Sequence, residues 1–195
     1  MYKRQLYDGD IAIDSETLGL IPRRDRLCVV QLSPGDGSAD VIQITKGQTE
    51  APNLVALLSD ESKTKLFHFG RFDIAVLYHT FGVTCAPVFC TKIASKLTRT
   101  YTDRHGLKDV CRELLGVDLS KQQQSSDWAA QELTQAQLEY AASDVLYLHA
   151  LRDKMTENLK REERIKHAGK CFEFLPTRAK LDLMGWEEVD IFAHS

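Results

Sequence analysis

The order of short apolar runs along the chain constrains its fold more than any other feature of the sequence. Three such runs, at residues 11–13, 27–32 and 41–44, are separated by clusters of Gly, Pro and Asp, and a fourth follows at residues 66–69. Short apolar runs bounded by turn residues are typical of strands. The first three therefore predict neighbouring strands joined by turns.

Helical patterns fill most of the remaining sequence. They predict helices at residues 53–58, 73–81, 91–97, 107–115 and 135–163. Gly82 and Gly116 are suitable helix ends, and Thr134 is a suitable N-cap for the last helix. Strands first, followed by alternating strands and helices, predict an α/β fold in which helices flank a mixed sheet.

The length of the chain suits one hydrophobic core rather than two. With 195 residues, we expect residues 1–195 to form a single domain, with a helical tail at about residues 160–195 packed on it. Apolar residues in this tail allow an alternative, an interface with a second copy, so monomer and homodimer both stay open.

Targeting and redox signals point to the cytoplasm. The N-terminal segment has no apolar core, and no uninterrupted apolar stretch approaches the roughly 20 residues that span a bilayer. The five cysteines contain no CxxC pair, which favours reduced thiols over a disulfide framework or a zinc site. We expect a cytoplasmic protein without a membrane segment.

Two acids end the first predicted strand. In the sequence IAIDSETLGL, Asp14 and Glu16 are two residues apart, so the period of a strand places both side chains on one face. Two carboxylates so close repel each other unless a cation lies between them. The pair indicates either divalent-metal ligation or an acidic strand end that faces solvent.

Further acids follow in two other motifs. Asp73 lies in LFHFGRFD, where a strand gives way to a helix, and alone it is an ordinary first-turn acid of a helix. Tyr140 and Asp144, in YAASD, are four residues apart, which places them on one helical face. Asp14, Glu16, Asp73 and Asp144 make a four-acid set suited to two metal ions, with Tyr140 beside the last of them.

In this order, the motifs resemble those of the DEDD exonuclease superfamily, in its tyrosine subclass, and within it the ribonuclease D-like proteins. The resemblance runs from about Ile11 to Leu151 and includes HGLKDV, ELLGVDLSK and SDW before the last predicted helix. It implies a ribonuclease H-like fold with a five- to six-stranded sheet. It also implies a 3′→5′ exonuclease without the helical modules that follow the nuclease domain in larger ribonuclease D proteins.

The resemblance assigns roles to the acids and to the tyrosine. Asp14 is expected to bridge two divalent ions, Glu16 and Asp144 to complete the shell of the first, and Asp73 to hold the second. Hard oxygen ligands favour Mg²⁺ or Mn²⁺ over zinc. Tyr140 is expected to orient the attacking water, because a phenol with a pKa of about 10 is a poor general base at neutral pH.

Residues that bind a single-stranded 3′ end are expected around these acids. Leu18 and Phe72 are candidates to wedge or stack terminal bases, with core packing as the alternative for both. The remaining candidates for substrate contact are Thr17, His68, Lys92, Lys96, Arg99, Lys121 and Gln124.

Charge supports a local rather than a global attraction to nucleic acid. The net charge is −3, yet residues 91–108 carry five basic residues against the single acid Asp103. This basic stretch, formed by Lys92, Lys96, Arg99, Arg104 and Lys108, is either a phosphate track or a solvated helix face.

The sequence departs from the family pattern at two places and leaves rival functions open. After SDW, residues 129–133 stand in place of the Arg-rich, Pro-containing turn that is usual in the family. Before Thr91, the family usually has an aspartate, and this chain has Cys90. RNA is the expected substrate, with DNA possible. The rivals are a DNA exonuclease, a non-catalytic nucleic-acid-binding module and a structural protein with an acidic calcium site.

Overall fold

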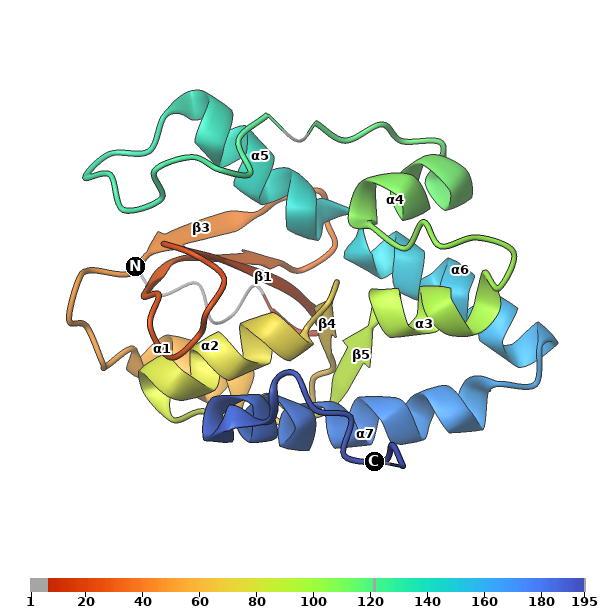
Figure 1. Cartoon of the computed structure of the whole chain (residues 1–195). Helices are drawn as coiled ribbons and strands as arrows, with labels where there is room; N and C mark the ends of the chain where they lie inside the picture. The colour runs from red at the N-terminus through yellow and green to blue at the C-terminus, as the bar shows by residue number, and fades with distance from the viewer. Residues whose placement is uncertain (1–6, 121, 195) are drawn as a thin grey trace.

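The computed structural model of the protein describes residues 7–120 and 122–194. A five-stranded mixed sheet forms its centre, with the strand order β3-β2-β1-β4-β5 (Figure 1). The strands are β1 (Ile11–Thr17), β2 (Leu27–Ser33), β3 (Asp40–Gln43), β4 (Lys65–Phe67) and β5 (Val88–Cys90). Strands β1, β2 and β3 pair antiparallel, whereas β1, β4 and β5 pair parallel. This confirms the predicted α/β fold with a mixed sheet.

Helices flank the sheet on both faces. They are α1 (Pro52–Leu58), α2 (Arg71–Phe81), α3 (Thr91–Thr98), α4 (Leu107–Leu115), α5 (Gln135–Leu146), α6 (Leu148–Arg161) and α7 (Ile165–Leu181), followed by the π-helical turn η2 (Asp182–Trp186). Helix α5 lies over β1 to β3, α1 and α2 lie on the opposite side, and α7 runs along α2 to β5 (Figure 1). None of the described helices is both long enough and apolar enough to cross a membrane.

The structure confirms three of the predicted helix ends. Gly82 and Gly116 close α2 and α4 with φ of 68° and 70°, a conformation that glycine adopts without a steric penalty. Thr134 caps α5 in a capping box, in which its side chain and that of Gln137 each bond to the other residue's backbone.

The single helix predicted over residues 135–163 is wrong, because two helices meet at Tyr147. The amide of Tyr147 bonds to the carbonyl of Val145 instead of continuing the α-helical pattern. Helix α5 packs on β1 to β3, whereas α6 packs on α3, α4 and β4. The break allows one apolar run to cover two surfaces that face different directions.

Strand β5 is absent from the sequence-based prediction. Its three residues lead directly into α3, so the segment is too short to show a period of its own. Its place at the parallel edge of the sheet is fixed by pairing with β4, which is a long-range contact.

The core explains why strand β2 can lie inside the sheet. All seven of its residues are buried, because helices cover both of its faces. In the neighbouring β1, Ile11, Ala12 and Ile13 are fully buried, whereas Asp14 and Glu16 are only half-buried. The strand therefore begins in the core, and its C-terminal half carries the acids.

Candidate active site

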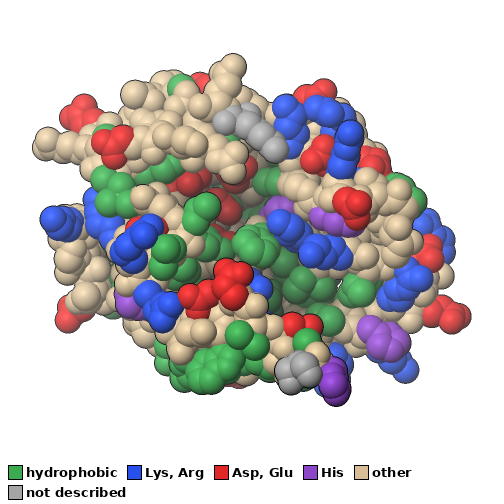
Figure 2. Space-filling view, viewed as in Figure 1, with side chains coloured by type: hydrophobic (Ala, Val, Ile, Leu, Met, Phe, Trp, Pro, Cys, Tyr) green, Lys and Arg blue, Asp and Glu red, His purple; other side chains and the backbone are tan. Residues whose placement is uncertain are grey.

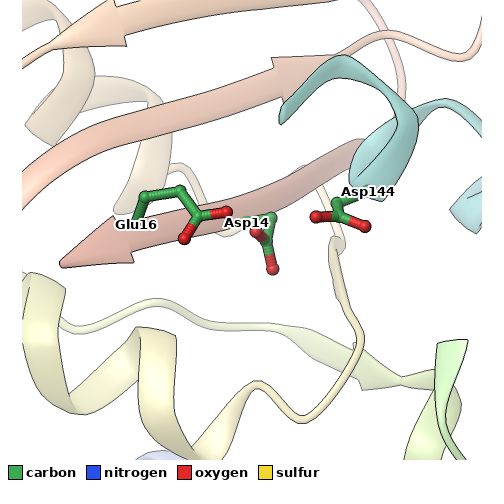
Figure 3. Close-up of side chains that lie close together, drawn as sticks. All are labelled: Asp14, Glu16 and Asp144. Atoms are coloured by element: carbon green, nitrogen blue, oxygen red, sulfur yellow. The ribbon is translucent and has the colours of Figure 1, made fainter. Parts of the chain in front are cut away.

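Strand β1 and helix α5 bring three carboxylates together. Asp14 and Glu16 project from the same face of β1, and Asp144 projects from α5, which crosses that face (Figure 3). One carboxylate oxygen from each of the three lies within 4.8 Å of those of the other two. The structure thus brings together three of the four acids that the sequence analysis names.

Asp73 reaches the same region from helix α2. It lies in the first turn of that helix, is 3% exposed, and accepts a hydrogen bond of 2.6 Å from the Ser15 hydroxyl. Ser15 stands between Asp14 and Glu16 on β1, so this bond ties the start of α2 to the acidic strand end. Asp73 lies outside the group of three, yet its charge is the largest electrostatic influence on Asp14.

Burial and mutual repulsion favour protons on these carboxylates when no cation is bound. Burial, followed by the charges of Asp144 and Asp73, raises the pKa of Glu16 to about 8. Burial raises the pKa of Asp73 to about 7 against the opposing hydrogen bond from Ser15. Burial, followed by the charges of the other three acids, raises the pKa of Asp14 well above its ordinary value.

Tyr140 lies one helical turn before Asp144. Burial and the neighbouring carboxylates raise the pKa of Tyr140, so its hydroxyl stays protonated and serves as a hydrogen-bond donor toward Asp144. Burial raises the pKa of Asp144 to about 7, and this donor opposes the rise. The ring packs beside Trp128, with centroids 6.0 Å apart.

The donor set fits a divalent cation. No described lysine or arginine is among the groups that perturb the four acids, so the structure offers no basic side chain to balance their charge. Buried charges of one sign require a counter-charge, and clustered carboxylate oxygens are the ligands that hard divalent cations prefer. The carboxylates of Asp14, Glu16 and Asp144 therefore fit a divalent cation, and Asp73 lies beside them.

Comparison with known proteins places this site in a family. A family model described as 3′-5′ exonuclease matches residues 2–160. The chain belongs to this 3′-5′ exonuclease family. Ribonuclease D of Gluconacetobacter diazotrophicus is 33% identical over 155 residues, which cover 80% of this chain and 39% of that protein. Ribonuclease D of Escherichia coli is 33% identical over 145 residues, 74% of this chain and 38% of that protein. The chain thus spans less than half the length of these curated relatives.

Solved structures of similar proteins share the fold. Brucella melitensis NrnC with bound Mg²⁺ has a TM-score of 0.96 and 67% identity, and the match covers 100% of this chain and 96% of that one. NrnC bound to pGG has a TM-score of 0.97, 68% identity and coverage of 100% and 95%. Escherichia coli RNase D has a TM-score of 0.79, 28% identity and coverage of 91% and 46%. These similarities confirm the predicted ribonuclease H-like exonuclease fold.

The apolar substrate candidates of this exonuclease fold differ in exposure. Leu18 follows the acidic end of β1 and is 53% exposed, so its side chain is accessible to the 3′ end of a nucleic-acid strand. Phe72 instead packs against the main core, which matches the alternative stated for it. The hydroxyl of Thr17 donates a hydrogen bond to the carbonyl of Gly19 and so holds the turn that presents Leu18.

The polar candidates also separate into accessible and enclosed groups. His68 is half-buried, its Nδ1 lies 2.8 Å from the Thr91 hydroxyl, and burial of the ring lowers the pKa of His68 to about 3. Lys92 is half-buried, whereas Lys96 and Gln124 are exposed. Lys121 lies outside the described residues.

Arg99 corrects one expectation. Its side chain is 2% exposed, and its guanidinium forms an ion pair with Glu113 while donating to the Ser95 hydroxyl and the Arg104 carbonyl. These partners occupy its donors, so Arg99 joins α3 to α4 and does not offer a phosphate contact. Arg99 is therefore removed from the part of the basic stretch that can contact phosphate.

Two residues near the acids were not among the sequence-based candidates. Gln31 is fully buried opposite Asp14 on β2, and neither of its amide atoms has a hydrogen-bond partner among the described residues. A polar residue inside the apolar run LCVVQLS was the available signal. Phe69, four residues before Asp73, is 45% exposed in a left-handed conformation that the apolar sequence context does not reveal.

Proposed function

We propose that the protein is a metal-dependent 3′→5′ exoribonuclease that removes nucleotides one at a time from a single-stranded 3′ end. The observation that carries this proposal is the convergence of Asp14, Glu16 and Asp144 within 4.8 Å, with Asp73 beside them. Membership of the 3′-5′ exonuclease family and similarity to ribonuclease D support the direction and the choice of RNA.

The proposed cofactor is a pair of divalent ions, Mg²⁺ or Mn²⁺. Asp14 would contact both ions, Glu16 and Asp144 would hold the first, and Asp73 would hold the second. Such a pair, when bound, activates the attacking water and stabilises the departing 3′-oxygen. The presence of Mg²⁺ in the structure of Brucella melitensis NrnC supports a divalent cofactor of this kind.

The protein's own groups position the reactants. Tyr140 keeps its proton, because burial and the nearby acids raise its pKa, so it can orient a water molecule but cannot accept a proton from it. The Ser15 hydroxyl donates a hydrogen bond to the Asp73 carboxylate and so fixes its orientation beside the other acids. Leu18, exposed next to the acids, is placed to separate the terminal base from its neighbour.

The test is a product ladder from labelled strands. Linear and circular RNA, and linear DNA of the same sequence, are incubated with Mg²⁺, with Mn²⁺ or with EDTA. We expect shortening of linear RNA from its 3′ end, no cleavage of circles and no activity in EDTA. Faster shortening of DNA would assign the site to the deoxyribonuclease alternative, and cleavage of circles would identify an endonuclease.

A matched pair of variants ties the activity to the site. Asp144→Asn removes one charge from the acidic cluster, whereas Asp153→Asn removes one from the exposed surface of α6. We expect the first variant to lose activity and the second to keep it. Equal activity of the two variants would separate the activity from this site.

A further inference from the structure

Phe69 has a backbone conformation that a bulky residue adopts only at a cost. Its φ is 67°, and in the described part of the chain only Phe69 and Glu163 are non-glycine residues with a positive φ. The side chain of an L-residue crowds its own backbone in this region, which glycine and asparagine tolerate far better. Something must compensate for retaining phenylalanine here.

Core packing does not compensate for this strain. Phe69 is 45% exposed, so it is neither a buried nor a partly buried member of the hydrophobic core. The turn itself is tight, because a Cβ added at Gly70 would lie 2.7 Å from the Cβ of Phe67. The chain therefore turns sharply into α2 and directs an aromatic ring outward at the turn.

Lys92 lies against this ring. Its Nζ is 4.3 Å from the centroid of Phe69, and none of the ion pairs among the described residues includes it. Lys96 follows one helical turn later and is exposed. An aromatic face next to cations that lack an acidic partner combines the two features by which proteins hold single strands, base stacking and phosphate attraction.

The position of this pair connects it to the acids. Asp73 follows Phe69 by four residues, in the first turn of α2, and is bonded to Ser15 of the acidic strand. On the face shown in Figure 2, acidic side chains gather in a hollow that hydrophobic and basic side chains border. A nucleic-acid strand whose 3′ end enters the acidic site thus has an aromatic and basic surface beside it.

We propose that Phe69 and Lys92 form a nucleobase-binding subsite, in which a base of the single strand stacks on Phe69 while Lys92 contacts an adjacent phosphate. The inference rests on the proposed function, because it places the base of the same strand that is cleaved. It explains the strained backbone as the cost of presenting a ring to the substrate.

A stability measurement separates strain from function. Phe69→Asn and Glu163→Asn both place a tolerant residue at a positive φ, so we expect Tm to stay level or rise in both variants. Only Phe69→Asn should raise KM, and kcat should change little because the acids are untouched. Phe69→Tyr keeps the ring and should keep the wild-type KM.

An abasic substrate tests the stacking contact directly. RNA oligonucleotides with one abasic residue at each of the last three positions are cleaved by the wild type and by Phe69→Asn. Loss of one stacked base typically costs roughly 5- to 150-fold in affinity. We expect the wild type to lose this much at one position, and Phe69→Asn to cleave the intact and abasic strands with equal KM there.

The outcomes distinguish this subsite from the proposed function. If the wild type does not cleave RNA, the proposed function fails and the subsite with it. If the wild type cleaves but both proteins lose the same affinity at every abasic position, only the stacking role of Phe69 is overturned. A large fall in Tm for Phe69→Asn would show that the ring serves the fold instead.

Discussion

Tyr140 and Asp144 lie on one face of α5, yet we expect substitutions at the two positions to affect metal binding and kcat differently. Asp144→Asn removes a charge from the three-acid group, so metal should bind weakly and the reaction should nearly stop. Tyr140→Phe keeps the ring beside Trp128 and removes only the hydroxyl. Loss of a group that positions a reactant typically costs on the order of 10²- to 10⁴-fold in kcat.

Calorimetric metal titration and single-turnover kinetics on both variants test this difference. We expect Tyr140→Phe to bind metal and RNA almost as the wild type does while kcat falls. Wild-type cleavage by Tyr140→Phe would make the tyrosine a packing residue of the cluster around Trp128 and would exclude a role in orienting water.

At the residue scale, the acids could be predicted because local periods determine their directions. Asp14 and Glu16 follow the period of a strand, and Tyr140 and Asp144 follow that of a helix. The burial of Arg99 could not be predicted, because it depends on Glu113, which comes from another helix. The sequence shows that a residue is basic, but only the tertiary contacts show whether its charge is free.

At the scale of elements, helix α3 carries the part of the basic stretch that is free to bind phosphate. We expect Lys92→Ala with Lys96→Ala to raise KM and flatten the salt dependence of substrate binding, with little change in Tm. Each phosphate contact that is lost should lower the log-log salt slope by about 0.7 on single strands. An unchanged slope, measured by KM between low and high salt, would make these lysines a solvated helix face.

Arg99 belongs to the same stretch and should behave in the opposite way. Arg99→Ala breaks the link between α3 and α4 and leaves Glu113 without its buried partner. The variant loses the buried guanidinium's hydrogen bonds to Glu113 and Ser95, which should cost roughly 1 to 3 kcal/mol, because Glu113 itself is 40% exposed and stays solvated. Urea unfolding should show this loss, whereas the salt slope of the folded variant should equal that of the wild type.

Element boundaries were predictable where a local signal marks them. Glycine ends α2 and α4, and a capping box begins α5. The break at Tyr147 has no such signal, since neither glycine nor proline lies there and the apolar pattern continues on both sides. What divides α5 from α6 is the direction of the surfaces that each one covers, and this follows only from the assembled sheet.

At the scale of the whole molecule, the C-terminal segment is attached to the helix that carries Asp73. Helix α7 packs along α2, and the Arg71 guanidinium is paired with Asp182, which also pairs with Arg178. These contacts support the proposal that residues 1–195 form one nuclease domain. They also connect the tail to the active site, because Arg71 lies two residues before Asp73.

The acidic site should make the stability of the whole protein depend on pH and on metal. In the folded protein the pKa of Glu16 is about 8 and those of Asp73 and Asp144 are about 7, well above their ordinary values. Without metal, the folded state therefore holds more protons than the unfolded chain between about pH 4 and 8. The free energy of unfolding must fall as pH rises through this window.

A divalent cation should reverse this loss, because it replaces the protons as the counter-charge. We expect Tm without metal to fall between pH 5 and 8.5, and Mg²⁺ to raise Tm most at the upper end. At 100 times its Kd, a ligand adds about 2.7 kcal/mol, or roughly 5 to 10 °C for a chain of this length. Asp14→Asn should reduce both the fall and the gain, since one of the repelling charges is gone. A metal-free Tm that rises through the same window, in scanning calorimetry of the wild type, would show that the four carboxylates are not the buried, mutually repelling set that the structure places at the end of β1.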